Sequence, residues 1–364
     1  MTLTKGRKKS YRGKKAMIIT FSVILCVISV FGIVYGSFCG RGGSYYTKDG
    51  SFRKIEKSDS YAYLVNDPAF QGFGSHMLPW NSGFLAAVTK PLSISYLMPK
   101  IELGNLDNII DGFNFLIDCA NQKELSYYSF YSKQQMEEEP SKKNTGILFL
   151  RGKAGAPFAF LCPGGGFVSV EANHEGYPVA KRLHEQGYNV FILFYRVKGD
   201  YKNPDQVDVA KNSSLDAGNA LRYIQTHAKE FQIQSDGYSM WGFSAGGYIV
   251  ASLSNPDDPE TGYAKYTGTA PAAAIMGYPA ITARFPTKYS AHNVPSYIAM
   301  CKDDQLIPFS DVEKRVNEMR ALGTEVEFRA FETGGHGFGC GAGTPEDGWM
   351  KPAIAFWNKQ AAKG

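Results

Sequence analysis

Residues 238–250 read YSMWGFSAGGYIV and place Ser244 between two glycines in the pattern Gly-x-Ser-x-Gly. This pattern is typical of a sharp turn from a strand into a helix, on which side chains at the two flanking positions would collide. Gly242 and Gly246 lack a Cβ and therefore fit the turn. The pattern predicts that Ser244 is held exposed and strained at a helix N-terminus. The N–H group of Ala245 would then face any negative oxygen that forms beside it.

The chain after Thr145 predicts the sheet that such a turn requires. Short apolar segments alternate with longer amphipathic ones, which is typical of an α/β fold with a mostly parallel central sheet and helices on both faces. The first two apolar segments are expected to pair as a hairpin. We expect strands at 146–152, 156–162, 189–195, 238–241, 272–277, 295–301 and 324–331, and helices at 177–186, 207–231, 309–322 and 348–360.

The N-terminal part of the chain carries a different signal. Residues 1–15 contain seven basic residues and no acidic one, and residues 16–36 contain no charge. An uncharged run of this length crosses a bilayer as a helix of about 30 Å, and a positive flank keeps its own side cytoplasmic. The sequence predicts a transmembrane signal-anchor at 16–36 with the rest of the chain extracytoplasmic. The alternative is a cleaved signal peptide and a secreted remainder.

Three segments complete the predicted organisation. Residues 37–60 are rich in Gly, Ser, Tyr and Lys and are expected to form a tether. Residues 61–144 are interpreted as an N-terminal extension that packs on the main α/β domain, which is expected at 145–364. Without the basic N-terminal segment the chain has 32 basic and 34 acidic residues. This balance predicts no basic surface for nucleic acid.

The cysteines and histidines do not predict a metal site. The six cysteines include no Cys-x-x-Cys pair, the spacing that usually accompanies a metal or redox site. His76, His184, His227 and His292 show no metal-ligand spacing either. We therefore expect neither a metal nor a cofactor.

Ligands of open α/β sheets bind beyond the carboxyl ends of the strands, and a glycine-rich loop is expected there beside the serine turn. The predicted strand at 156–162 is followed by Pro163 and three glycines. Backbone without side chains is able to approach a ligand closely. The N–H groups of Gly165 and Gly166 are expected to join that of Ala245 in an oxyanion hole.

A carboxylate and an imidazole at the same edge complete the predicted constellation. Asp303 and Asp304 follow one predicted strand, and His336 lies in a glycine-rich loop after the next. The chain order serine, aspartate, histidine is the order in α/β-hydrolases. His336 would take up the Ser244 proton, and an aspartate would orient the imidazole ring. The D-x-x-I-P spacing favours Asp304 for this role, with Asp303 facing solvent.

Other side chains near this edge admit two interpretations. Three aromatic residues are candidates for lining a substrate pocket: Phe167, Tyr195 and Phe243. Tyr195 and Arg196 are alternatively a packed ring and a structural ion pair, and Asp216 is interpreted as structural. His174 and Glu175 are expected either to line the pocket or to lie in a solvated loop.

Six motifs occur together in this part of the chain: PGGGF (163–167), NVFILFYRV (189–197), SLDAGNALRYI (214–224), GFSAGG (242–247), DDQLIP (303–308) and GGHGFG (334–339). With them, the chain from about residue 145 to the C-terminus resembles the α/β-hydrolase superfamily. Within it, the resemblance is to small-acyl esterases of the acetyl esterase and acetylxylan-esterase-like group.

The resemblance implies a serine esterase that cleaves small acyl esters, acetylated carbohydrates among them, with Ser244, Asp304 and His336 as the triad. The chain departs from the family pattern at Pro163, because related esterases commonly have His-Gly-Gly-Gly there. In those esterases the histidine organises the loop. Peptide hydrolysis or acyl transfer on the same triad stays open. So does a catalytically inactive hydrolase fold that serves as a cell-surface binding protein.

Overall fold

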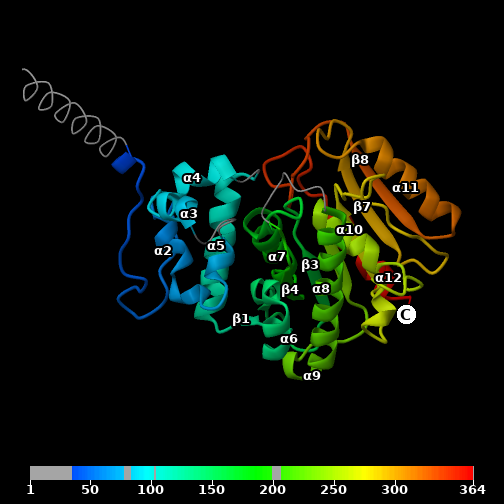
Figure 1. Ribbon diagram of the computed structural model, residues 1–364, viewed down its shortest axis with the longest axis horizontal. Coiled ribbons are helices and arrows are strands. Elements are labelled where there is room, and N and C mark those ends of the chain that lie inside the picture. Colours follow the sequence, from blue (N-terminus) through cyan, green and yellow to red (C-terminus); the bar gives the residue numbers. More distant parts are fainter. Residues whose placement is uncertain (1–34, 78–82, 102–103, 199–205, 364) are drawn as a thin grey trace, which may run out of the picture.

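The computed structural model of the chain describes four ranges (Figure 1): 35–77, 83–101, 104–198 and 206–363. The predicted basic segment and almost all of the apolar run at 16–36 lie outside them. Within the described ranges, no helix has both the length and the apolar character needed to cross a bilayer. The membrane anchor therefore stays a prediction.

The described strands form one sheet in the order β1-β2-β4-β3-β5-β6-β7-β8. Pairing is antiparallel from β1 to β2 and from β2 to β4, and parallel everywhere else. Strands β2 to β7 are buried along their whole length, as continuous apolar runs under helices on both faces should be. The strands are β1 (Leu125–Tyr128), β2 (Gly146–Leu150), β3 (Phe158–Cys162), β4 (Asn189–Phe194), β5 (Ser239–Phe243), β6 (Ala273–Gly277), β7 (Ser296–Cys301) and β8 (Val326–Phe331).

The predicted hairpin of the first two apolar segments is wrong, because β4 lies between β2 and β3. Ile192 of β4 is opposite Leu148 of β2 on one side and opposite Leu161 of β3 on the other. Strand β3 is fully buried and pairs in parallel with both β4 and β5. A hairpin partner cannot take that central position, since a hairpin joins antiparallel neighbours.

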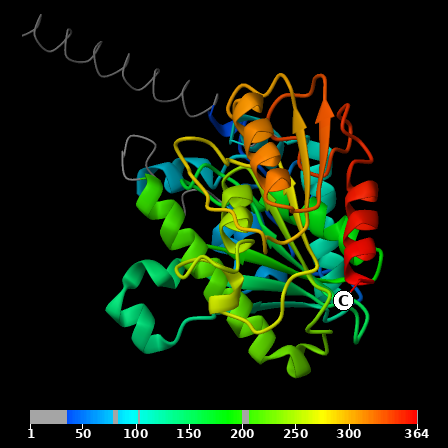
Figure 2. The same ribbon diagram turned by 90° about the vertical axis from the view of Figure 1, so that its right-hand side faces the viewer.

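Helices cover both faces of the sheet. Helices α8 and α10 pack on each other on one side, whereas α12 packs against β6 on the opposite side (Figure 2). The long helix predicted at 207–231 divides at His227, whose backbone leaves the helical region. The helices are α2 (Tyr61–Val65), α3 (Gly83–Thr89), α4 (Ile94–Ile101), α5 (Leu106–Asn121), α6 (Lys133–Glu138), α7 (Tyr177–His184), α8 (Gln206–Thr226), α9 (Ala228–Phe231), α10 (Ala245–Leu253), α11 (Phe309–Ala321) and α12 (Met350–Ala361). Shorter turns are the 3₁₀ helices η1 (Pro68–Phe70), η2 (Gly74–Met77), η3 (Pro140–Asn144) and η5 (Tyr263–Lys265), and the π-helix η4 (Ala172–Gly176).

The described residues of 61–144 share one hydrophobic core with the described residues that follow them. Strand β1 extends the sheet at one edge, and α5 packs beside α7 (Figure 1). A Cβ at Gly112 of α5 would lie 3.2 Å from atoms of Tyr177 and Pro178. The glycine therefore lets the two helices approach closely.

The segment expected as a tether, 37–60, contacts this extension. Ile55 is buried, and the ring of Phe38 stacks on that of Tyr96 with 4.1 Å between centroids. The segment therefore packs against the extension instead of projecting away from it.

His76 ties the extension to the sheet and gives stability a pH dependence. Its ring stacks on Phe194 at 4.6 Å and its Nε2 lies 3.2 Å from the Tyr127 hydroxyl. Burial lowers the pKa of His76 from 6.5 to about 4. Between these values the unfolded chain binds a proton that the folded chain excludes, so acid favours unfolding.

We predict that this group removes at most about 3 kcal/mol from the free energy of unfolding as the pH falls from 7 to 4. Urea unfolding at several pH values measures this free energy. In His76→Phe, which keeps the ring contact with Phe194, the pH dependence should become shallower over that window. If the free energy of unfolding depended on pH equally in the wild type and in His76→Phe, His76 would not be the group responsible.

Candidate active site

The turn between β5 and α10 holds Ser244 in the predicted strained conformation. Its φ of 48° and ψ of −116° are rarely adopted by a residue with a side chain. A Cβ at Gly242 would collide with the carbonyl oxygen of Gly246, and a Cβ at Gly246 with that of Cys162 in β3. The two glycines therefore allow β5, α10 and β3 to meet beneath the serine.

His336 and Asp304 lie in line with the serine. The Ser244 Oγ is 3.0 Å from His336 Nε2, and His336 Nδ1 is 2.7 Å from Asp304 Oδ2. The Asp304 side chain is fully buried and that of His336 is 5% exposed. The backbone N–H groups of Leu306 and Ile307 each donate to Asp304 Oδ1 at 2.8 Å. Because these bonds fix the carboxylate, it sets both the tautomer and the orientation of the imidazole.

Asp303 is exposed, as predicted, but it also has a contact that the sequence did not reveal. It accepts hydrogen bonds from the N–H groups of Gly334, at 3.3 Å, and Gly335, at 2.8 Å. Asp304 contacts the His336 ring, whereas Asp303 holds the loop that carries it. The two neighbouring carboxylates therefore perform different tasks.

The glycine loop after β3 and the start of α10 supply three candidate oxyanion donors. Gly165 and Gly166 adopt φ values of 112° and 62°, which favour glycine. Among the described residues, no acceptor bonds to the N–H groups of Gly165, Gly166 or Ala245. These three groups thus keep their hydrogen-bonding capacity for a ligand.

Two of the three residues predicted for the pocket are buried in the structure. Tyr195 is 1% exposed, and its hydroxyl donates to the carbonyl oxygens of Pro163 at 2.7 Å and Gly164 at 2.9 Å. Phe243 is fully buried and packs on Trp349. The packed ring that was the alternative for Tyr195 agrees with this burial, and Phe243 at the end of β5 faces the core instead of a pocket.

The third predicted pocket residue, Phe167, is also largely buried, at 2% exposure. Its ring lies 5.4 Å from that of the half-buried Phe285 and 5.9 Å from that of Tyr248. Tyr248 is one helical turn from the serine. Phe167 therefore belongs to an aromatic cluster beside the turn.

Sequence reasoning missed the role of His174 and Glu175, which are buried in η4 and do not lie in a solvated loop. His174 Nε2 is 2.5 Å from the carbonyl oxygen of Gly337, next to His336. Glu175 accepts the N–H of Gly164 at 2.5 Å. Their position after the glycine loop was the only signal in the sequence.

Asp216 has the structural role predicted for it. It is fully buried and accepts hydrogen bonds from the Tyr131 hydroxyl at 2.6 Å and from the backbone and guanidinium of Arg196. Arg196 also pairs with Glu139. The ion pair of Asp216 with Arg196 therefore fixes the chain at the end of β4, next to the glycine loop.

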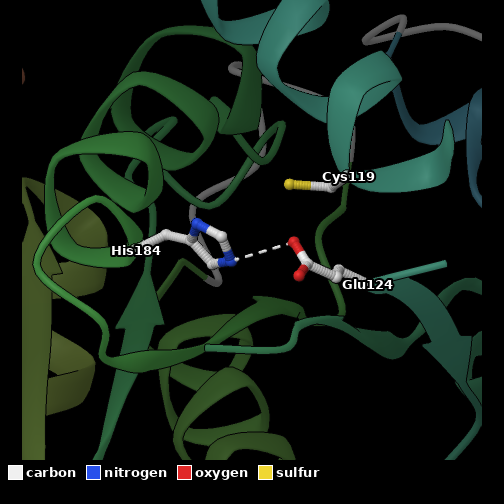
Figure 3. A group of neighbouring side chains, drawn as sticks. All are labelled: Cys119, Glu124 and His184. Carbon is white, nitrogen blue, oxygen red and sulfur yellow. Dashed lines mark ion pairs between the residues drawn. The ribbon is translucent and has the colours of Figure 1, made fainter. Parts of the chain in front are cut away.

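One group of side chains in the described ranges brings metal-ligand atoms together. Cys119, Glu124 and His184 point toward one another (Figure 3), with one ligand atom each within 4.8 Å of the others. His184 Nε2 is 2.8 Å from the carbonyl oxygen of Arg151. A carbonyl only accepts, so this nitrogen carries a proton and has no lone pair for a metal. Burial also raises the pKa of Cys119 to about 12. Within the group, His184 Nε2 lies 3.6 Å from Glu124 Oε2, and this contact joins the end of α7 to the segment that follows α5.

Comparisons with known proteins agree with this architecture. The family model described as BD-FAE matches residues 150–261. An acetylxylan esterase of Xylanibacter ruminicola is 26% identical over 49% of this chain and 40% of its own length. Endo-1,4-beta-xylanase B of Butyrivibrio fibrisolvens is 28% identical over 43% of this chain and 24% of its own. The chain thus covers less than half of either relative.

A solved structure gives the same fold. An α/β-hydrolase enzyme from a Medee basin deep-sea metagenome library is 23% identical, with a TM-score of 0.52 over 65% of this chain and 98% of that one. The chain has an α/β-hydrolase fold. The predicted resemblance to esterases of the α/β-hydrolase superfamily is confirmed.

The close approach beneath Ser244 predicts that Gly246→Ala destabilises the protein. The new methyl group meets backbone oxygen atoms that cannot move aside, so we expect a loss of about 1–3 kcal/mol in the free energy of unfolding. Gly268→Ala is the matched control, because nothing lies within 4 Å of its Cβ position. Equal urea midpoints for the two variants would contradict the packing argument.

Proposed function

We propose that the protein is a serine carboxylic-ester hydrolase that acts on small acyl esters. The observation that carries the proposal is the continuous hydrogen-bonded line from Ser244 through His336 to the buried Asp304. A hydroxyl becomes a nucleophile when a neighbouring base takes its proton, and His336 is within reach to do so. No cofactor is required for this chemistry.

In the acylation step, Ser244 Oγ attacks the ester carbonyl carbon while its proton passes to His336 Nε2. Asp304 stabilises the imidazolium that results. The imidazolium then gives this proton to the alcohol oxygen as the carbon–oxygen bond breaks, which leaves the acyl group on Ser244. Water, deprotonated by His336, releases the acid and restores the serine.

The negative oxygen of the tetrahedral intermediate would be bound by the N–H groups of Gly165, Gly166 and Ala245. The dipole of α10 adds to this attraction, because its N-terminus begins at Ala245. One such donor contributes about 2.7–4 kcal/mol to stabilising a transition state.

Acetyl esters of carbohydrates are the substrates that we favour. The support is the similarity to an acetylxylan esterase over 40% of that protein's length. We further propose that residues 16–36 anchor the chain in a membrane, with the hydrolase extracytoplasmic, on the sequence pattern alone.

Peptide hydrolysis and acyl transfer use the same triad, and an inactive fold would serve only for binding. The hydrogen-bonded line gives an inactive fold no support. Incubation with an acetylated xylo-oligosaccharide, nitrophenyl esters of increasing chain length and a prolyl peptide separates these functions. We expect free acetate from the first and falling rates with longer acyl chains. Cleavage of the peptide alone would overturn the proposal.

Ser244→Ala should lower turnover of a short-chain nitrophenyl ester by on the order of a million-fold, because the attacking atom is removed. The fold should persist by circular dichroism. Ser310→Ala is the control, since Ser310 is an exposed serine in α11. Substantial activity in Ser244→Ala would exclude this mechanism.

Asn replacements at the two neighbouring aspartates should separate their roles. Asp304→Asn donates where it should accept and favours the wrong tautomer of His336, so turnover should fall by about 10⁴-fold. Asp303→Asn retains an acceptor oxygen for the loop and should cost less than about tenfold. Steady-state kinetics with one ester tests both. A reversed order would show that Asp303 orients the ring.

A further inference from the structure

A buried carboxylate that the triad does not use lies between the two loops that build the site. Glu175 is 3% exposed and sits in η4, a π-helical turn, a local distortion that often occurs at functional sites. Among the described residues, no lysine or arginine pairs with it. Burying a carboxylate without a lysine or arginine beside it is costly.

Both carboxylate oxygens of Glu175 are used. Oε2 accepts the N–H of Gly164 at 2.5 Å, and Oε1 accepts the hydroxyl of Tyr278 at 2.8 Å. The Tyr278 oxygen in turn accepts the N–H of Gly339 at 3.0 Å, so its own proton is directed at Glu175. This arrangement joins the glycine loop after β3 to the loop that carries His336.

Tyr278 also contacts the base directly. It follows β6 with a positive φ of 36°, and its ring meets the imidazole of His336 edge-on at 4.7 Å. Such a conformation is strained for a residue with a side chain, and the packing between the two loops maintains it. Any change in the Glu175 contact is therefore transmitted to both loops.

The charge of Glu175 bears on the same ring. The pKa of Glu175 is raised above its ordinary value, because burial outweighs the charges of His174 and His336 and the bonds from Tyr278 and Gly164, which lower it. Both oxygens accept, which favours the ionised form. The titratable groups that face this network are His174, Tyr195, Tyr278, His336 and Cys340, with Cys162 and Glu171 beside Tyr195 and Asp304 on the far side of His336.

We infer that Glu175 is a positioning residue that locks the oxyanion loop to the histidine loop through Tyr278, and whose charge favours the imidazolium of His336. The role rests on the proposed esterase function. It also accounts for Pro163, since Glu175 and Tyr195 hold the adjacent glycine in a loop that lacks the family's organising histidine.

The test compares Glu175→Gln and Tyr278→Phe with Glu171→Gln in the full chain. Glu171 is a matched control in the same segment, because within the described ranges the hydrogen bond to its carboxylate comes from the Ser169 hydroxyl and not from either loop of the network. We expect Glu175→Gln to lower kcat on the order of a hundredfold and Tyr278→Phe about tenfold, with KM within about threefold. Glu171→Gln should stay within about twofold of the wild type.

Two further measurements respond to positioning and charge specifically. The acidic limb of the pH–rate profile should move to lower pH in Glu175→Gln, because the imidazolium loses a nearby negative charge, but not in Tyr278→Phe. Amide hydrogen exchange should accelerate in residues 163–170 and 333–340 together in both variants.

If Glu175→Gln has the same kcat, pH–rate profile and amide hydrogen exchange as Glu171→Gln, the inference is overturned. Faster exchange in the glycine loop alone would refute the link between loops, and an unmoved acidic limb would refute the role of the charge. If the wild type cleaves no ester, the proposed function fails, and hydrogen exchange still decides whether Glu175 couples the loops. Tyr278→Phe preserves the test if Glu175→Gln does not fold.

Discussion

The rest of the site depends on the backbone of Ser244, which is held at a positive φ where β5 turns into α10. A turn this tight forms only if nothing fills the space between β5, α10 and β3. Gly242 and Gly246 leave that space open. The central position of β3 follows from the same requirement, because β3 must run parallel to β5 to bring its glycine loop beside the serine.

Three carboxylates stabilise the loops around this turn. Glycine-rich loops are flexible, and their N–H groups need acceptors if the loops are to keep one conformation. Asp304 binds the N–H groups of its own loop and the imidazole, Asp303 binds the N–H groups next to His336, and Glu175 binds Gly164. The acidic side chains thus define the geometry of the site through the backbone as well as through the His336 ring.

The sequence predicted the elements whose signals are local. The serine turn and the alternation of strands and helices follow from short patterns, and the structure has them. The preference for Asp304 also rests on a short pattern, and in the structure Asp304 contacts the His336 ring. The strand order did not follow, because nothing between β2 and β3 indicates that β4 inserts there. The Glu175–Tyr278 bond joins residues 103 positions apart, and no spacing rule reaches across that distance. The sequence left Tyr195 open between a pocket residue and a packed ring, because a strand-end position does not reveal the direction of its side chain.

The central claim is that Ser244 forms a covalent acyl intermediate. Rapid mixing of the protein with an acetyl ester, acid quenching and peptide mass spectrometry would test it most directly. The account predicts one added acetyl group per chain, located on the peptide that contains Ser244 and lost as acetate appears. An acetyl group on any other residue, or product formation without an acylated protein, would contradict it.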